Sequence, residues 1–378
     1  MIMRKFAVLH LGLVLSLLLG SVALAQEPSG DFGVIQRTLE AELADWNLLI
    51  SADALHDNLN DGETSNDPFI VSVRDPADYE KGHIAGAINI PFTEIAKPEN
   101  LAKLPTDRQI VTYCYTGDAG QVSATVLKAL GYDVTNLEYG MMGWTQNDDV
   151  LAWPRFGPDT EQRDYAVEID ANATTQTHDY PQVATGEEDD WEIVRAAADA
   201  WLNSGTFPFD SADAVFDNLN DGNDSNNPVI VSVRLPDAYA TGHVPGAINI
   251  PWTEITKPEN LAKLPPDSPI RTYCYNGHAG QLASTALGLL GYDVANIGYG
   301  IMAWTEDDEV LGMDRYDPET SPDYPVEGTA VGASAVEEAA PEAVPETGGA
   351  AIPVEGILLG FGTLAAAAGL YLRRRIPA

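Results

Sequence analysis

A long internal repeat constrains this 378-residue chain more than any other feature. Four residues of the first half recur in the second half, each displaced by 160 positions, so no net insertion or deletion separates the copies. The pairs are Arg74 and Arg234, His83 and His243, Cys114 and Cys274, and Trp144 and Trp304. A repeat of this length can bury its own hydrophobic core, so we expect two duplicated domains rather than short solenoid units.

The chain's two cysteines lie at equivalent points of the copies, each at the end of an apolar, β-prone run. A glycine-containing loop follows each cysteine and leads into helix-like runs at residues 122–130 and 282–290. Such a loop aims backbone N–H groups and the positive end of a helix at one point, where a thiolate or an anion is stabilised. Two cysteines in an exported chain could form one disulfide, but their equivalent places in separate domains favour free thiols.

Strands and helices alternate in both copies, which predicts an α/β fold with a mainly parallel sheet in each domain. Functional loops of such sheets lie at the carboxyl ends of the strands, where the cysteine loops are expected. A helical lead-in is predicted at residues 32–49, a helix capped by Ser51 follows, and another helix is predicted at 189–203. We predict one domain at residues 26–165 and a second at residues 189–323, joined by an acidic linker at 166–188.

Both ends of the chain carry targeting patterns. Residues 1–25 combine a basic start, an apolar run and a small-x-small site, which favours a cleaved secretory signal over a membrane anchor. Residues 324–348 form a predicted disordered stalk, and 349–378 contain a hydrophobic tail followed by arginines. The tail resembles a sortase sorting signal with Val344 in place of the usual leucine, so covalent surface anchoring and a plain transmembrane anchor both stay open.

The chain is strongly acidic, with 57 acidic against 20 basic residues and a formal net charge of −37. Phosphate binding needs a basic footprint, so nucleic acid is excluded as a partner. We expect no metal and no cofactor. His83 and His243 are interpreted as packed turn residues rather than catalytic bases, because neither has metal-ligand spacing to another His or Cys. Residues 58–68 and 218–228 are interpreted as turns rather than calcium loops, since the EF-hand spacing is missing.

Several motifs occur twice and in the same order. They are Arg74, the block Gly-His-Ile-Ala-Gly-Ala-Ile-Asn-Ile-Pro at residues 82–91, the strand ending in Cys114, a Gly-Tyr-Asp strand, and a closing Gly-x-x-x-Trp block with Trp144 as a core or lid residue. Together they resemble the rhodanese domain family, and the match covers nearly all of both copies. The resemblance implies a cysteine that takes up sulfane sulfur as a persulfide from a small sulfur donor and passes it to a thiol or cyanide.

The resemblance also assigns the site. Cys114 and Cys274 match the sulfur-carrying position, and the two loops match its substrate-binding cradle. The loop residues are Tyr115, Thr116, Gly117, Asp118 and Ala119 in the first copy, and Tyr275, Asn276, Gly277, His278 and Ala279 in the second. The family's usual loop arginine is replaced by alanine in both copies, and its usual aspartate two residues before Arg74 and Arg234 is serine. Use of thiosulfate, a dianion, is therefore the activity that these changes weaken.

Three functions are compared for these residues. A sulfurtransferase uses both thiols, whereas a surface binding or sulfur-sensing module would keep only the fold. A cysteine phosphatase needs an arginine that closes the loop around phosphate, and the loops have none. The loops differ four residues after the cysteine, where Asp118 should raise the thiol pKa and a partly protonated His278 should lower it. Cys274 is therefore predicted to be the more active sulfur carrier.

Overall fold

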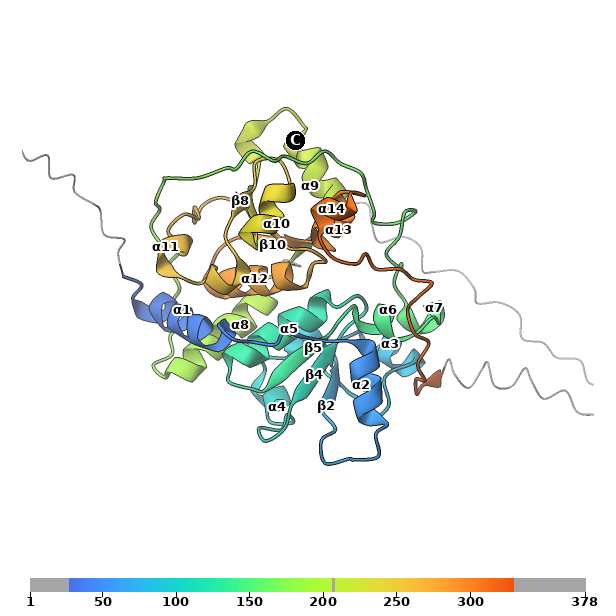
Figure 1. The fold of residues 1–378 in the computed structure, drawn as a ribbon. Coiled ribbons are helices and arrows are strands. Elements are labelled where there is room, and N and C mark those ends of the chain that lie inside the picture. Colours follow the sequence, from blue (N-terminus) through green and yellow to red (C-terminus); the bar gives the residue numbers. More distant parts are fainter. Residues whose placement is uncertain (1–26, 206–207, 330–378) are drawn as a thin grey trace, which may run out of the picture. The chain divides into compact units, whose positions relative to one another are not determined.

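The computed structural model describes residues 27–205 and 208–329, and both repeats lie within one compact unit. Each repeat contains a five-stranded sheet flanked by helices (Figure 1). The strand order is β1-β5-β4-β2-β3 in the first repeat and β6-β10-β9-β7-β8 in the second, and every pairing is parallel. The predicted α/β class with two tandem parallel-sheet domains is confirmed.

The strands are β1 (Leu49–Ile50), β2 (Phe69–Ser72), β3 (Ile88–Asn89), β4 (Ile110–Tyr113), β5 (Val134–Leu137), β6 (Phe209–Asp210), β7 (Val229–Ser232), β8 (Ile248–Asn249), β9 (Ile270–Tyr273) and β10 (Val294–Ile297). Helices of the first half are α1 (Gly30–Leu43), α2 (Ala52–Leu59), α3 (Pro76–Lys81), α4 (Pro98–Leu101), α5 (Asp118–Ala129), α6 (Gly140–Trp144) and α7 (Asp148–Leu151). Helices of the second half are α8 (Asp190–Leu202), α9 (Ala212–Leu219), α10 (Pro236–Thr241), α11 (Pro258–Leu261), α12 (His278–Leu289), α13 (Gly300–Trp304) and α14 (Asp308–Leu311). Short 3-10 turns are η1 (Phe92–Glu94), η2 (Asp224–Asn226) and η3 (Trp252–Glu254).

The central strands are buried on both faces, as expected of parallel sheets covered by helices. Alternate side chains of β4 enter different cores: Ile110 packs with α1 and α5, whereas Val111 and Tyr113 pack with α2, α6 and α7. Both cores continue into the second repeat. In one core α5 packs against α12 and α1 against α8, and in the other Phe156 packs against Tyr299. The two repeats therefore share buried surface.

The predicted helical lead-in is too long. Helix α1 ends at Leu43, and Leu49 and Ile50 form the edge strand β1, which pairs with β5. Trp46 lies between them and donates its indole N–H to the backbone oxygen of Val134 over 2.7 Å. A two-residue strand has no periodicity of its own, so its partner strand decides its conformation. The predicted cap is confirmed, since the Ser51 hydroxyl accepts from the N–H of Ala54.

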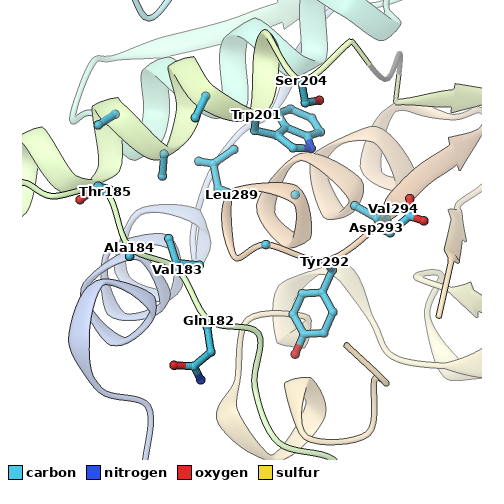
Figure 2. A pocket seen from close by; sticks show the side chains of 15 residues that line it. Gln182, Val183, Ala184, Thr185, Trp201, Ser204, Leu289, Tyr292, Asp293 and Val294 are labelled. Carbon is cyan, nitrogen blue, oxygen red and sulfur yellow. The ribbon is translucent and has the colours of Figure 1, made fainter. Parts of the chain in front are cut away.

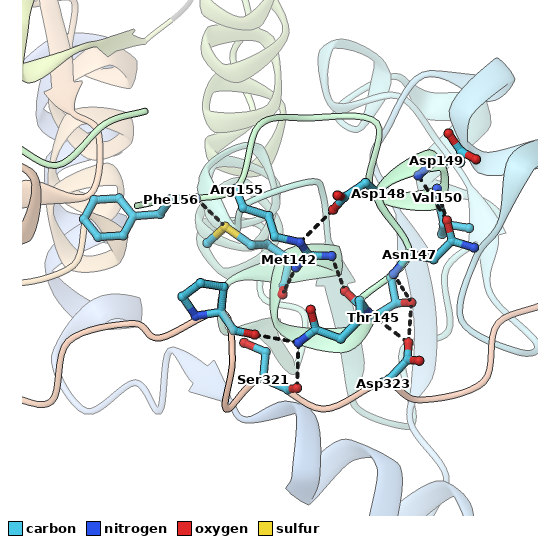
Figure 3. Close-up of polar contacts among 12 residues, drawn as sticks. Met142, Thr145, Asn147, Asp148, Asp149, Val150, Arg155, Phe156, Ser321 and Asp323 are labelled. Atoms are coloured by element: carbon cyan, nitrogen blue, oxygen red, sulfur yellow. Dashed lines mark hydrogen bonds and ion pairs between the residues drawn. The ribbon is translucent and has the colours of Figure 1, made fainter. Parts of the chain in front are cut away.

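The segment that follows each repeat lies on the other repeat. We call residues 163–168 and 321–329 the exchanged straps. The indole N–H of Trp304 donates to Ala166 O, and that of Trp144 donates to Pro325 O, over 3.0 and 3.1 Å. Figure 3 shows the second strap against the first repeat, where the Thr145 hydroxyl donates to Asp323 Oδ1 over 3.0 Å. Each strap therefore ties the end of one repeat to the other.

The predicted linker and stalk are partly described. Residues 166–188 run mostly without helix or strand, and contacts such as His178 N–H to Ala262 O hold them on the second repeat. The first six residues of the predicted stalk, 324–329, contact the first repeat, where His83 and Glu327 pair as an antiparallel bridge. The predicted signal (1–25), the rest of the stalk and the tail (349–378) lie outside the described residues. Within 27–205 and 208–329, no helix has the length and apolarity that crossing a bilayer requires.

Candidate functional site

Each cysteine lies between the carboxyl end of a central strand and the start of a long helix. Cys114 directly follows β4, and α5 begins at Asp118, four residues earlier than predicted. Gly117 has a φ of 101°, a left-handed conformation that suits glycine, and this turn brings its N–H to 3.1 Å from Cys114 Sγ. The second repeat repeats the geometry, with 3.2 Å from Gly277 N to Cys274 Sγ. The positive end of a twelve-residue helix thus faces each thiol.

Both cysteines are free thiols, as predicted, and both are almost completely buried, with 2% of Cys114 and 1% of Cys274 exposed. Burial raises the pKa of both thiols because it penalises the thiolate. The charge of Asp118 raises the pKa of Cys114 further, while loop N–H groups act in the opposite direction at both sites. The closed sites therefore hold neutral thiols that backbone donors are placed to stabilise once they ionise.

The first loop places its side chains in two groups. The Tyr115 hydroxyl donates to Asp78 Oδ2 over 2.7 Å, which ties this side chain to α3. Thr116 is buried and donates its hydroxyl to Asp118 Oδ2 over 2.8 Å. Burial raises the pKa of Asp118 to about 6, although the hydrogen bond from Thr116 lowers it. Ala119 is buried and leaves no cation at the position of the family's arginine.

The second loop differs in the residue two positions after the cysteine. The Asn276 side-chain oxygen lies 3.9 Å from Cys274 Sγ, within range of the thiol's weak S–H donor. Its amide nitrogen donates to Glu138 and to the Tyr139 hydroxyl of the first repeat, over 3.2 and 3.3 Å. The Tyr275 hydroxyl accepts from the N–H of Leu235, just as the Tyr115 hydroxyl accepts from the N–H of Asp75. Ala279 is partly buried.

The predicted role of His278 is wrong. This imidazole is 2% exposed, and burial lowers its pKa to about 4, so it is neutral near pH 7 and cannot act as a cation beside Cys274. It points into the first repeat, where its Nε2 accepts from the N–H of Tyr139 over 3.3 Å. A Cβ on Gly117 would come within 2.2 Å of the imidazole, so the first loop has no room for a larger residue. This contact joins positions 139 residues apart and so was not predictable from the local sequence pattern.

Sequence reasoning also missed four residues beside the loops. Tyr139 and Glu138 face the second loop, while Tyr299 and Glu161 act electrostatically on Asp118 or on the first loop. Burial raises the pKa of both glutamates. A Tyr-Gly pair follows β5 and β10 in both repeats, and this shared pair is the sequence feature that could have pointed to the tyrosines.

Arg74, His243 and the two tryptophans of the closing blocks occupy packed positions. Arg74 is 1% exposed and donates to the backbone oxygens of Val150 and Gly82, and its guanidinium lies 5.6 Å from the Tyr115 ring. His243 is buried and stacks on Tyr239, so the packed interpretation of the histidines holds in the second repeat. Both tryptophans of the closing blocks are core residues. Among the described residues, no group of three or more His, Cys, Asp or Glu is placed to hold a metal ion.

A cavity of about 650 Å³ lies elsewhere in the second repeat (Figure 2). It opens between α8, residues 182–185 and the turn from α12 to β10, and Trp201 and Leu289 lie on its walls. Neither a cysteine nor a residue of the two cysteine loops lines it. The chemistry predicted from the cysteines is therefore not located in this cavity.

Comparison with known proteins identifies both repeats. A model of the rhodanese-like domain matches residues 51–147 and 212–307, slightly more than half of the chain. The chain is 31% identical over 99 residues to a sulfurtransferase of Allochromatium vinosum, covering 26% of this chain and 88% of that one. It is 38% identical over 78 residues to a probable adenylyltransferase/sulfurtransferase, MoeZ, of Mycobacterium tuberculosis, but this covers only 20% of either chain.

A solved structure spans both repeats. That of a thiosulfate sulfurtransferase from Pseudomonas aeruginosa covers 72% of this chain and 48% of its own, with 17% identity and a TM-score of 0.27. A rhodanese-like domain protein from Staphylococcus aureus covers 25% of this chain and 87% of its own, with 29% identity and a TM-score of 0.23. The double family match agrees with the observed fold and with a cysteine at the same loop of each repeat. The chain belongs to the rhodanese-like domain family, with two such domains in tandem.

Proposed function

We propose that this protein is a sulfurtransferase that carries sulfane sulfur as a persulfide on Cys114 and Cys274. The observation that carries the proposal is the placement of each thiol at a helix N-terminus, with a loop N–H about 3 Å from the sulfur. Relatives named as sulfurtransferases support the same reaction class. In the first step the thiolate attacks the outer sulfur of the donor, and the donor's S–S bond breaks with its electron pair leaving on the remainder. An acceptor thiolate or cyanide then takes the sulfur and regenerates the cysteine thiolate.

The electrostatics of the loops favour donors other than thiosulfate. Carboxylates lie beside both sites, with Asp118 and Glu161 at the first and Glu138 at the second, and alanine replaces the loop arginine. A dianion is repelled at such a site. A hydropolysulfide or a small alkyl persulfide carries at most one negative charge on its sulfur chain and is the preferred donor class.

Mass spectrometry of the purified chain tests the proposal. After exposure to polysulfide, the peptides of Cys114 and Cys274 should gain the mass of one sulfur atom and lose it again when cyanide or a thiol is added. Cys274→Ser should remove most of the transfer activity and Cys114→Ser less, because Asp118 raises the pKa of Cys114 alone. If neither peptide gains sulfur, the proposed persulfide is contradicted. If the two variants lose equal activity, the greater role of Cys274 is contradicted.

A binding or sulfur-sensing role is the second candidate, and the burial of both thiols favours it. A sensor needs a cysteine that reacts slowly and changes the fold, whereas a carrier needs repeated access. Turnover of many sulfur atoms per chain in the presence of donor and acceptor supports the carrier. Stoichiometric modification without turnover supports the sensor.

The proposed location is the outer surface of the cell, with the signal at residues 1–25 removed and the tail at 349–378 anchoring the chain to the membrane or cell wall. The small-x-small site before Gln26 and the arginines after the apolar tail support this topology. N-terminal sequencing of the mature protein should begin at Gln26. A chain that begins at Met1, or that external protease cannot reach in intact cells, would contradict it.

A further inference from the structure

A tyrosine in each repeat has an unusual backbone conformation beside the cysteine loops. Tyr139 and Tyr299 have φ values of 57° and 55°, in the left-handed region that side chains other than glycine rarely adopt. Each begins a turn that is fastened to its own loop, since the N–H of Met141 donates to Cys114 O and that of Ile301 donates to Cys274 O. A strained residue that the surrounding structure holds in place is a reason to look for a role.

Tyr139 contacts the cysteine loop of the second repeat. Its ring lies 5.4 Å from the His278 ring, edge to face, and its hydroxyl accepts from Asn276 Nδ2 over 3.3 Å. The other end of the Asn276 amide lies 3.9 Å from Cys274 Sγ. A short series of polar contacts thus joins the Tyr139 hydroxyl to the thiol of the other repeat.

Tyr299 has the reciprocal position at the first loop. It is 3% exposed, its ring lies 4.8 Å from Phe156, and its hydroxyl is 4.0 Å from Met142 Sδ. Burial raises its pKa, and the charges of Asp118 and Cys114 are close enough to raise it further, while Thr116 hydrogen-bonds to it. The surroundings of Tyr299 are therefore residues of the first repeat.

We propose that Tyr139 and Tyr299 each close the sulfur site of the opposite repeat, so that a donor reaches Cys274 only after Tyr139 moves, and Cys114 only after Tyr299 moves. The cysteines are 1% and 2% exposed, whereas a donor must place its outer sulfur in line with the thiolate. The inference rests on the proposed function only for the reason why a site must open, which is to admit a sulfur donor. The closure itself concerns only which residue covers which thiol.

Labelling of the thiols tests the closure without any sulfur transfer. Tyr139→Gly and Tyr299→Gly remove one ring each and place glycine where the backbone favours it, so the turns are kept. The full chain is treated with iodoacetamide, and the rate is measured separately for the two cysteine peptides. We expect Tyr139→Gly to accelerate labelling of Cys274 about tenfold and to leave Cys114 within about twofold of the parent, because protection here reflects local opening. Tyr299→Gly should give the reverse.

This crossed pattern distinguishes the proposal from ordinary destabilisation. The proposal is overturned if labelling accelerates at the cysteine of the mutated repeat, if it accelerates equally at both cysteines, or if neither labelling rate changes. If a glycine variant fails to fold, the corresponding phenylalanine variant decides. Tyr139→Phe loses only the hydroxyl contact with Asn276 and should still accelerate Cys274 over Cys114, by about threefold, and equal rates would contradict the closure. A parent protein that takes up no sulfur would refute the proposed function while leaving the labelling result intact.

Discussion

Asp118 is a buried carboxylate whose ionisation opposes folding at neutral pH. Its folded pKa of about 6 exceeds its ordinary value of 3.8, so the unfolded chain releases this proton first as the pH rises. The contribution of Asp118 to stability falls as the pH rises from about 4 to 6 and is level above, and a shift of this size corresponds to about 3 kcal/mol. Asp118→Asn removes the titration and should raise the free energy of unfolding near pH 7 by up to about 3 kcal/mol. Urea unfolding from pH 4 to pH 8 measures it.

The control is Asp149→Asn, which removes a carboxylate that is exposed at the start of α7. It should leave the pH dependence of the parent unchanged. If Asp118→Asn raises the free energy of unfolding equally at pH 4 and pH 8, the charge of the carboxylate is not the cause of the gain.

A second prediction at this scale concerns the His278 imidazole. Burial lowers its folded pKa to about 4, so below about pH 6.5 the unfolded chain binds this proton and the folded chain does not. The contribution of His278 to stability should therefore fall as the pH drops from about 6.5 to 4, and His278→Gln should remove this contribution from the profile. Urea unfolding across this range measures the slope, which for Asp118 runs in the opposite direction. An unchanged slope in the variant would mean that the imidazole protonates freely in the folded state.

The sequence located both candidate cysteines but not their surroundings. The position of Cys114 at a strand end, its free thiol and the glycine turn follow from residues close together in sequence. The neutrality of His278 and the placement of Tyr139 depend on the other repeat and so were not predictable from local pattern. Burial shifts the pKa of a side chain, and the sequence of one repeat does not show which of its side chains the other repeat buries.

At the scale of elements, the exchanged straps should stabilise the repeat that they contact rather than the one that they follow. Tyr324 stacks on His56 with ring centroids 3.8 Å apart and donates its hydroxyl to Asp53 over 2.6 Å. Tyr324→Ala should cost about 1–3 kcal/mol, from the ring contacts and one charge-assisted hydrogen bond. Hydrogen exchange should show the lost protection in α2 of the first repeat.

The matched variant is Tyr165→Ala in the other strap. Tyr165 stacks on Phe216 at 3.8 Å and donates to Asp213 over 2.6 Å, so its loss should lower protection in α9 of the second repeat. Loss of protection in the repeat that precedes each strap would contradict this assignment.

The elements themselves were mostly predictable, and the exceptions have a common cause. Apolar runs such as β4 and the capped helix α2 carry their own periodicity and capping residues. The straps and β1 do not, because an extended segment takes its place from the surface that it meets. Composition identified residues 166–188 as an acidic linker and 324–348 as a disordered stalk, but it did not show that 324–329 lie on the first repeat.

At the scale of the whole molecule, the two repeats should unfold as one cooperative unit. Their cores are continuous through α5 and α12, each strap lies on the other repeat, and the side chain of Gln36 in α1 donates to Thr256 O in the second repeat. Separating the repeats would expose this shared apolar surface and break the hydrogen bonds of Gln36 to Thr256 O and of the strap donors, so a chain with only one folded repeat should not be populated.

Calorimetry measures the size of the unit that unfolds. The structure describes roughly 300 residues, for which about 0.7 kcal/mol per residue gives an unfolding enthalpy of about 210 kcal/mol near 60 °C. One cooperative unit gives a van't Hoff enthalpy equal to this calorimetric value, whereas two independent repeats give about half of it. Cys114→Ser and Cys274→Ser alter one repeat each and should both shift the single transition without splitting it. Two resolved transitions, with only one moving in each variant, would show that the repeats fold separately and that the shared cores add little to stability.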